Sequence, residues 1–170
     1  MHRFVLQLFL LINLIHHATG QVSIEAQVGG ANFMGMTVNS RLDIPLNQTG
    51  EHALSPAIGI GMMAPWWDRP TGIINAGITY KYKGWGIGTE VSAFDMPFVT
   101  EREPRDFTDI IIYPNFNYTF KIKSNWYLRL SAGPYFAFSR PSGAFVIEPE
   151  LRFEGDVIPG AGIGFGYVIK

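Results

Sequence analysis

The sequence from Phe107 to Arg140 is FTDIIIYPNFNYTFKIKSNWYLRLSAGPYFAFSR, and it contains two segments in which apolar residues occupy every second position. The even-numbered positions from 110 to 120 and from 126 to 138 are aliphatic, aromatic, alanine or proline. The odd-numbered positions carry many residues that form hydrogen bonds, such as Asn115, Asn117 and Arg129. A period of two is the period of a β-strand, so this stretch predicts two strands joined by a short turn.

The same alternation extends over almost the whole chain, from Val22 to Ile169, and no segment after residue 20 has a helical period. We expect an all-β fold, an antiparallel transmembrane β-barrel of eight strands, which is the smallest number common in membrane barrels. The expected strands are 22–38, 53–63, 73–83, 85–95, 107–121, 125–139, 143–154 and 156–169.

The two faces of these strands differ in a way that indicates lipid outside and a crowded polar interior. The apolar face is dense in aromatic and aliphatic residues and is almost free of charge. The opposite face carries glycine, serine and asparagine beside isolated charges, whereas the wet face of a soluble sheet usually carries lysine, glutamate and threonine. In a membrane every backbone group must be paired within the protein, and a closed barrel achieves this.

Charged residues on the inward face include both signs in similar number, which predicts a lumenal network of ion pairs. Its expected members are Glu25, Lys81, Glu90, Arg129, Glu148, Glu150 and Arg152. Side chains just fill an interior that is eight strands wide, so the network would plug the barrel and exclude a wide diffusion pore. The alternating glycines from Gly160 to Gly166 would leave room for long charged side chains of neighbouring strands.

Glu148 and Glu150 also allow an enzymatic interpretation, as an acid/base pair on one strand face. An ion-pair network explains the same spacing, because Arg152 follows at the next position on that face. Beyond residue 20 the chain has a single histidine, His52, in an expected loop, so neither a catalytic triad nor a histidine-rich metal site has supporting spacing. We therefore expect no enzymatic activity, no metal and no cofactor.

The first twenty residues have the layout of a secretory signal peptide. A short basic start, 1–3, precedes an apolar segment at 4–15, and Ala18-Thr19-Gly20 places small residues where a signal peptidase cleaves. The alternative is an N-terminal membrane anchor, but the apolar segment is shorter than the roughly 18 residues of a membrane-spanning helix. We expect a signal peptide over 1–20 and one barrel domain over 21–170.

Composition excludes further classes of protein. The chain has no cysteine, so an exported domain cannot rely on disulfides, and no cysteine is available for lipid attachment. The chain has 13 basic and 14 acidic residues, and removal of Arg3 with the signal segment leaves a formal charge of −2. Such a charge gives no reason to expect binding to nucleic acid.

Tryptophan residues near the expected strand ends are candidates for the membrane–water interface, where amphipathic rings are favoured. These interface aromatics are Trp66, Trp67, Trp85 and Trp126.

Three segments carry a resemblance to a known family. The block DIIIYPNFNYTF at 109–120 is followed by a Lys/Asn turn and by WYLRLSAGPY at 126–135, and GGANF lies at 29–33. This pattern resembles small porin-like outer-membrane β-barrels of the PorT family, and the end of the chain, 164–169, is similar to an outer-membrane assembly signal. The chain departs from the family by ending on Ile169-Lys170 rather than on an aromatic residue.

The resemblance implies a location in the outer membrane of a Gram-negative envelope, contact with outer-membrane lipid, and a structural, adhesive or export accessory role. Exposed loops would then be the contact surfaces for envelope or export proteins. The alternative is a secreted soluble barrel of lipocalin or avidin type, which would bind a small apolar ligand. That arrangement inverts the faces and buries Ile110, Phe116, Leu128 and Phe136 in the lumen.

The expected strand count conflicts with the orientation of such barrels, whose short turns lie on the periplasmic side. With 22–38 as one strand, the turns at Lys83-Gly84 and at 123–125 fall on the outside. Three explanations are open: the segment 53–63 does not span, the orientation is unusual, or the chain lacks final strands.

Overall fold

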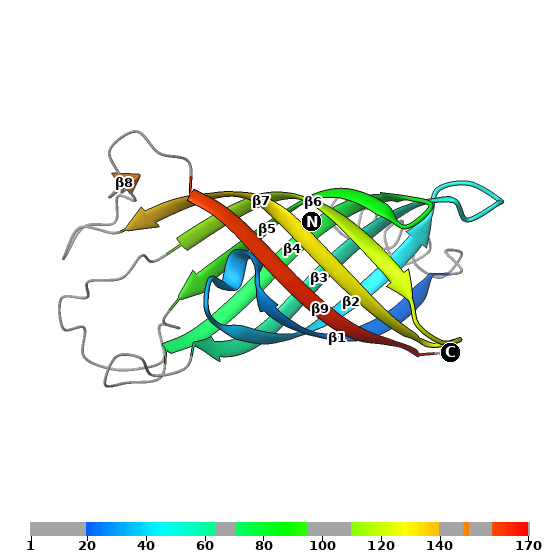
Figure 1. Ribbon diagram of the computed structural model, residues 1–170, viewed down its shortest axis with the longest axis horizontal. Coiled ribbons are helices and arrows are strands. Elements are labelled where there is room, and N and C mark those ends of the chain that lie inside the picture. Colours follow the sequence, from blue (N-terminus) through cyan, green and yellow to red (C-terminus); the bar gives the residue numbers. More distant parts are fainter. Residues whose placement is uncertain (1–19, 64–70, 95–109, 140–147, 150–157, 170) are drawn as a thin grey trace, which may run out of the picture.

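The computed structural model describes residues 20–63, 71–94, 110–139, 148–149 and 158–169, and these form a closed antiparallel β-barrel of eight long strands (Figure 1). The barrel strands are β1 (Gln21–Gly29), β2 (Met36–Pro45), β3 (His52–Met63), β4 (Thr71–Tyr82), β5 (Trp85–Phe94), β6 (Ile110–Lys121), β7 (Trp126–Ser139) and β9 (Ile158–Ile169). In this part of the chain no helix is long and apolar enough to cross a membrane.

Each barrel strand pairs with its neighbour in the sequence, and β9 closes the ring. One edge of β9 pairs with β7 and the other with β1, so that Phe165 lies opposite both Leu128 and Ala26. The two-residue strand β8 (Glu148–Pro149) pairs only with the end of β7. The closed ring leaves no free edge among its eight strands.

The prediction of one strand over 22–38 is wrong, because this segment forms two strands and a reversal. Strand β1 ends at Gly29, a short 3₁₀ helix η1 (Gly30–Asn32) follows, and β2 begins at Met36 and runs antiparallel to β1. The reversal requires left-handed backbone angles, with φ of 74° at Gly29, 60° at Gly30 and 56° at Phe33. Glycine adopts such angles without a steric penalty, which explains two of the three positions.

The strand expected at 143–154 also does not belong to the barrel as described. Only Glu148 and Pro149 of this segment lie within the described residues, and strand β7 pairs directly with β9 along ten residue pairs. The number of eight strands is nevertheless correct, because the extra strand β2 replaces the expected seventh strand.

The position of β2 also removes the conflict over orientation. Three short connections, 46–51, 83–84 and 122–125, lie at the same end of the barrel as the start of β1 and the end of β9 (Figure 1). We call this the short-turn end. Strand β3 contains the segment 53–63 and spans the barrel, and β9 closes the ring, so neither a missing strand nor a non-spanning segment is needed.

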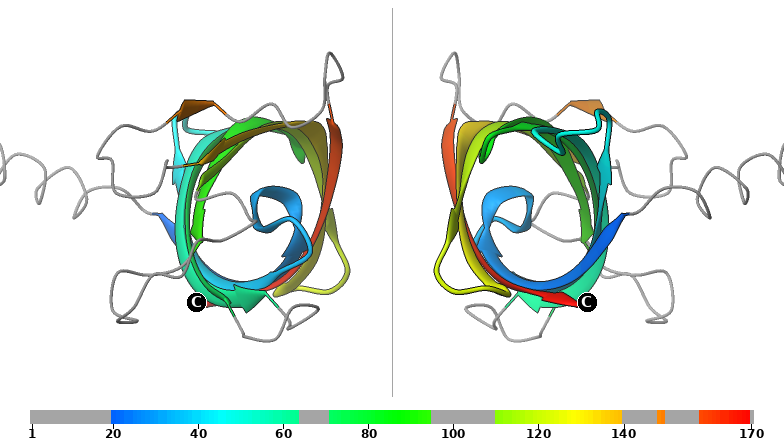
Figure 2. Two further views of the ribbon diagram at one scale, coloured as in Figure 1. Left: turned by 90° about the vertical axis from the view of Figure 1, so that its left-hand side faces the viewer. Right: turned by 90° about the vertical axis from the view of Figure 1, so that its right-hand side faces the viewer.

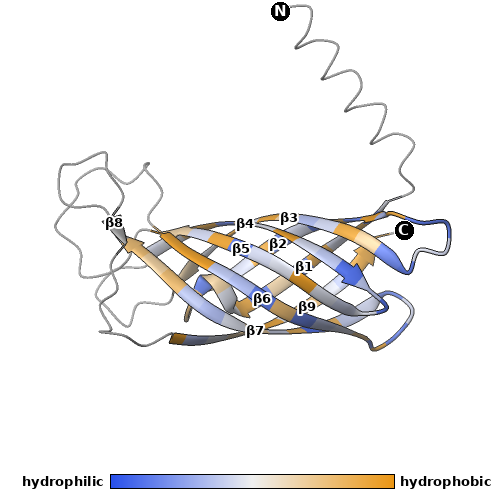
Figure 3. Ribbon diagram, turned by 90° about the horizontal axis from the view of Figure 1, so that it is seen from above, coloured by the Kyte–Doolittle hydropathy of each residue, from blue (hydrophilic) through white to orange (hydrophobic). Residues whose placement is uncertain are grey.

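Burial alternates along much of the barrel strands, and most of the buried residues are polar. On β1, Ser23, Glu25 and Gln27 are at most 3 % exposed, whereas Ile24 and Val28 are about half exposed. When the ribbon is coloured by hydropathy, hydrophilic and hydrophobic segments alternate along the strands (Figure 3). The inward face is therefore mostly polar and the outer face mostly apolar, the reverse of a soluble protein.

Candidate functional site

The connection between β1 and β2 folds into the barrel at the end opposite the short turns. Gly30, Ala31 and Asn32 are buried, and η1 contacts β5, β6, β7 and β9. Seen along the barrel, this blue segment lies inside the ring of strands (Figure 2). We call residues 30–33 the plug.

The side chain of Asn32 fixes the plug to three strands. Its Nδ2 donates a hydrogen bond to Thr37 Oγ1 (2.9 Å), and its Oδ1 accepts from Ser92 Oγ (2.9 Å) and Asn75 Nδ2 (3.3 Å). Asn32 is fully buried, and these bonds satisfy an amide that would otherwise be costly to bury.

An apolar cluster lies on the inward face around the plug. It consists of Met63, Ile73, Phe94 and Ile111, against which Phe33 and Tyr135 pack. The rings of Phe33 and Tyr135 meet edge to face, with 5.9 Å between their centroids. The interior is therefore apolar at this end of the barrel, in contrast to the layers below.

Arg129 is the centre of a buried ionic layer beneath the plug. Its Nε and Nη2 donate to the carboxylate of Glu25 at 2.8 to 3.2 Å, and its Nη1 donates to Glu90 Oε1 at 2.9 Å. Gln27 completes the layer, because its Nε2 donates to Glu90 Oε2 (2.7 Å) and its Oε1 accepts from Arg129 Nη2 (3.0 Å). These three charged groups are nearly inaccessible to solvent.

A second arginine balances the charge of this layer. Arg41 Nη2 donates to Glu25 Oε1 at 3.2 Å, and the Arg41 side chain is 2 % exposed. The two arginines, Arg41 and Arg129, therefore face two carboxylates, Glu25 and Glu90. Buried charges are tolerated when they are paired and hydrogen-bonded in this way.

The plug rests directly on the ionic layer. A side-chain carbon added at Gly30 would lie 2.7 Å from Gln27 Nε2 and 3.1 Å from Glu90 Oε2. The plug and the ionic layer are thus stacked directly on one another inside the barrel.

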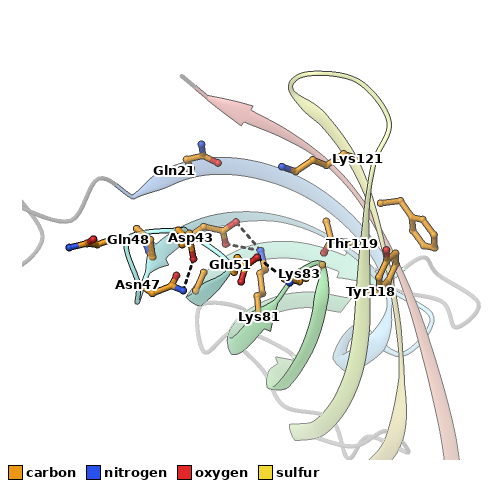
Figure 4. Close-up of a pocket in the computed structure, with 16 residues that line it drawn as sticks. Gln21, Asp43, Asn47, Gln48, Glu51, Lys81, Lys83, Tyr118, Thr119 and Lys121 are labelled. Carbon is orange, nitrogen blue, oxygen red and sulfur yellow. Dashed lines mark hydrogen bonds and ion pairs between the residues drawn. The ribbon is translucent and has the colours of Figure 1, made fainter.

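A cavity of about 980 Å³ lies at the short-turn end of the barrel (Figure 4). Its wall includes Asp43 of β2, Lys81 of β4 and Thr119 of β6, and its rim includes Glu51, Lys83 and Lys121. Lys81 Nζ donates to both carboxylate oxygens of Asp43, at 2.7 and 2.9 Å, and Lys83 Nζ lies 3.1 Å from Glu51 Oε1. We call this space the mouth cavity.

The structure brings three of the expected network residues together and separates a fourth. Glu25, Glu90 and Arg129 form the ionic layer, whereas Lys81 lies nearer the short-turn end and pairs with Asp43. Glu148 lies in β8, outside the ring, and its side chain is outside the described residues together with Glu150 and Arg152. The enzymatic interpretation of Glu148 and Glu150 therefore falls outside the described part of the chain.

Sequence reasoning missed Arg41, Asp43 and Asn32. The first two lie in 39–52, between the predicted strands 22–38 and 53–63, although Leu42 and Ile44 continue the alternation of the preceding residues. That continuation was the signal for a longer strand. Asn32 lies within the predicted strand 22–38, and the nearby Gly29-Gly30 pair is the signal in the sequence for a reversal.

Two of the four expected interface aromatics lie on the outer face near the short-turn end. Trp85 is 63 % exposed and contacts the ring of Tyr118, and Trp126 stacks on Phe165 with 5.0 Å between centroids. Trp66 and Trp67 lie outside the described residues.

Within the described ranges, no group of three His, Asp or Glu residues is placed to hold a metal ion. Comparison of the chain with protein-family models, curated proteins and solved structures found no match.

Proposed function

We propose that this protein is an outer-membrane β-barrel with a closed interior that serves as a structural, adhesive or envelope-export accessory component rather than as a pore. The observation that carries the proposal is the outer face. At the outward positions of the eight described barrel strands, there is no Asp, Glu, Lys or Arg.

The outer face also exposes far more apolar surface than water favours. Ile58, Ile60 and Phe116 are each more than 60 % exposed, and they belong to a band that continues around the barrel. Contiguous apolar patches of this kind mark membrane or protein contacts. Lipid chains provide apolar contacts for such a surface, and the closed ring provides hydrogen-bond partners for the backbone groups of the strands.

A group of exposed aromatic side chains near the short-turn end supports the same environment. Its members are Tyr80, Tyr82, Trp85, Phe120, Trp126 and Tyr167. They come from β4, β5, β6, β7 and β9, at the strand ends next to the short turns. Girdles of aromatic residues near the strand ends, at the membrane–water interface, are typical of barrels that cross a bilayer.

The connections favour one orientation in the membrane. Short turns and both ends of the barrel lie together, and membrane barrels keep short turns on the periplasmic side. We therefore assign the short-turn end to the periplasm and the connections 64–70, 95–109 and 140–157 to the outside. Their sequences contain most of the acidic residues of the chain, and these connections are the candidate contact surfaces for envelope or export proteins.

The two stacked layers argue against a diffusion pore. The plug lies inside the ring of strands and rests on the buried ionic layer, and side chains just fill the interior of a barrel of eight strands. A structural or adhesive role uses the outer connections and does not need an open lumen.

The alternative of a secreted soluble barrel with an apolar lumen requires the opposite arrangement of faces. Phe116 and Phe136, which would line that lumen, are 67 % and 41 % exposed on the outside. The buried polar residues occupy the inside instead. These positions support lipid rather than water around the barrel.

Membrane fractionation tests the proposal. The full chain is expressed with its own N-terminal segment, and the outer-membrane fraction is analysed by gel electrophoresis with and without boiling. We expect the protein in that fraction, with a mobility that changes on heating because the closed barrel survives detergent. Soluble protein without such a change would overturn the proposal and favour the soluble alternative.

A further inference from the structure

The ladder of strand pairs between β6 and β7 is interrupted partway along the barrel wall. In these two described strands the pairing stops at Ile112 opposite Phe136 and resumes at Phe116 opposite Ala132, so the three register positions between them are unpaired. The ladder between β4 and β5, by contrast, is continuous along its ten pairs. We call the three unpaired positions the β6–β7 gap.

Two prolines that face each other explain the gap. The register places Pro114 directly opposite Pro134, and neither residue has an N–H group, so the two bonds of a hydrogen-bonded pair cannot form there. The ladders on the other sides of these residues are intact, because Pro114 is paired with Thr89 of β5 and Pro134 with Pro159 of β9. In an antiparallel pair the N–H and C=O groups of one residue point toward the same neighbouring strand. Both missing donors therefore fall in the β6–β7 gap.

On the inner side of the gap, the polar contact between side chains of β6 and β7 is long. The Tyr113 hydroxyl lies 3.4 Å from Ser131 Oγ on β7 and 3.3 Å from the carbonyl oxygen of Gly160 on β9. Well-formed hydrogen bonds of a hydroxyl to oxygen are shorter than this. The rings of Tyr113 and Tyr135 also lie against each other, with 5.3 Å between their centroids. These contacts do not fully replace two backbone hydrogen bonds.

A groove of about 440 Å³ lies over the gap on the outer face of the barrel. Its wall includes Pro114, Phe116, Gly133 and Pro134, together with Ile87 of β5, and none of the residues that line it is charged. The gap therefore lies between an apolar groove on the outside and two tyrosine rings on the inside.

We propose that the β6–β7 gap is a lateral gate, a place where the barrel wall opens locally between the outer groove and the tyrosine rings. Loss of two ladder bonds lowers the free energy that is needed to separate the strands there, relative to an uninterrupted ladder. The gate lies in the wall and not along the barrel axis, so it is compatible with the plug inside the ring. It goes beyond a structural or adhesive role and requires only the barrel fold.

Hydrogen exchange measures the opening. The full chain is isotopically labelled and refolded in dodecylphosphocholine micelles, and the exchange of single amides is followed by NMR. Ile112 borders the gap, and Val91 of β5 and Ala76 of β4 lie in the same row, where the ladder is continuous. We expect the protection factors of Ile112 and Phe136 to be about tenfold or more below those of Val91 and Ala76. Equal protection at the four positions would overturn the proposal.

The double variant Pro114→Ala, Pro134→Ala restores both N–H groups and should close the gap. We expect the protection factors of Ile112 and Phe136 to rise about tenfold or more. Pro134→Ala alone restores one donor and takes the place of the double variant if that chain does not refold.

Pro159→Ala is the matched control. Pro159 lies beside Pro134 on the outer face, and the ladder between β7 and β9 is uninterrupted there, so this change adds no bond across the gap. It should leave the protection of Ile112 and Phe136 unchanged. If the double variant raised their protection no more than Pro159→Ala does, the two prolines would not control the opening and the proposal would be overturned.

Discussion

Arg129 on β7 donates hydrogen bonds to both carboxylate oxygens of Glu25 on β1, although strand β9 lies between these two strands. Arg129 Nε lies 3.1 Å from Glu25 Oε2, and Arg129 Nη2 lies 2.8 Å from Glu25 Oε1. The two residues are 104 positions apart in the sequence. The planar guanidinium of Arg129 therefore links β1 to β7 on the inner side of β9, the strand that closes the ring.

Replacement of Arg129 by methionine should destabilise the barrel strongly, because it leaves Glu25 and Glu90 buried with insufficient positive charge. Loss of one partner from a buried ion pair costs about 3–5 kcal/mol. The free energy of unfolding can be measured by urea titration of the barrel refolded in lipid vesicles. Arg129→Lys should also destabilise, because an ammonium cannot reproduce the bidentate geometry.

The matched control is Lys83→Met, which removes a cation from the exposed pair with Glu51. An exposed pair is screened by water, so the free energy of unfolding should change little. If Arg129→Met changed the free energy of unfolding as little as Lys83→Met, the ionic layer would not stabilise the barrel.

Gly164→Val should disturb the same contact by adding a side chain to β9. A side-chain carbon at Gly164 would lie 2.7 Å from Glu25 Cδ, and Glu25 is held in place by Arg41 and Arg129. Overpacking of this kind costs about 1–3 kcal/mol. Urea unfolding of Gly164→Val is compared with that of Ala161→Val, which introduces the same valine side chain on the exposed face of the same strand. Equal stability of the two variants would show that Glu25 moves aside freely.

The inward positions of Glu25, Glu90 and Arg129 could be inferred from sequence because strand alternation fixes the face of each residue. The face on which a residue lies follows from the alternation within its own strand. An error about which strands are neighbours therefore does not change the predicted face. The pairing partners could not be inferred, since Glu25 and Arg129 meet only after β9 inserts between their strands.

The error at 22–38 has a physical cause. Turns are recognised in a sequence partly because they are exposed and polar. The β1–β2 connection is instead buried inside the barrel, and its Ala31 and Phe33 are apolar like the strand residues around them. Only Gly29-Gly30 marked the reversal, and that signal was outweighed by the alternation on either side.

Asn32→Ala should loosen the plug without opening the ring of strands. The change removes the bonds to Thr37, Asn75 and Ser92, which leaves buried polar groups unpaired at a cost of about 1–3 kcal/mol. Hydrogen exchange of the Phe33 and Gly35 amides, which bond to carbonyls of the plug, should accelerate relative to amides of the strands. The exposed variant Gln48→Ala should leave both amides unchanged. Unaltered exchange in Asn32→Ala would mean that backbone bonds alone hold the plug.

Ile58→Lys tests the environment of the outer face and separates the two candidate functions. Ile58 lies near the middle of β3 and is 63 % exposed on the outside. A lysine at the centre of a bilayer destabilises a barrel by about 2–4 kcal/mol, whereas a lysine on a water-exposed surface costs little. We expect a destabilisation of that size when the variant is refolded in lipid vesicles and unfolded with urea, together with a reduced yield in the outer-membrane fraction. Ser124→Lys, in the exposed β6–β7 turn, adds the same charge at the short-turn end and should have neither effect. If Ile58→Lys behaved like Ser124→Lys, the middle of the barrel would face water, and the apolar band would need a protein partner rather than lipid.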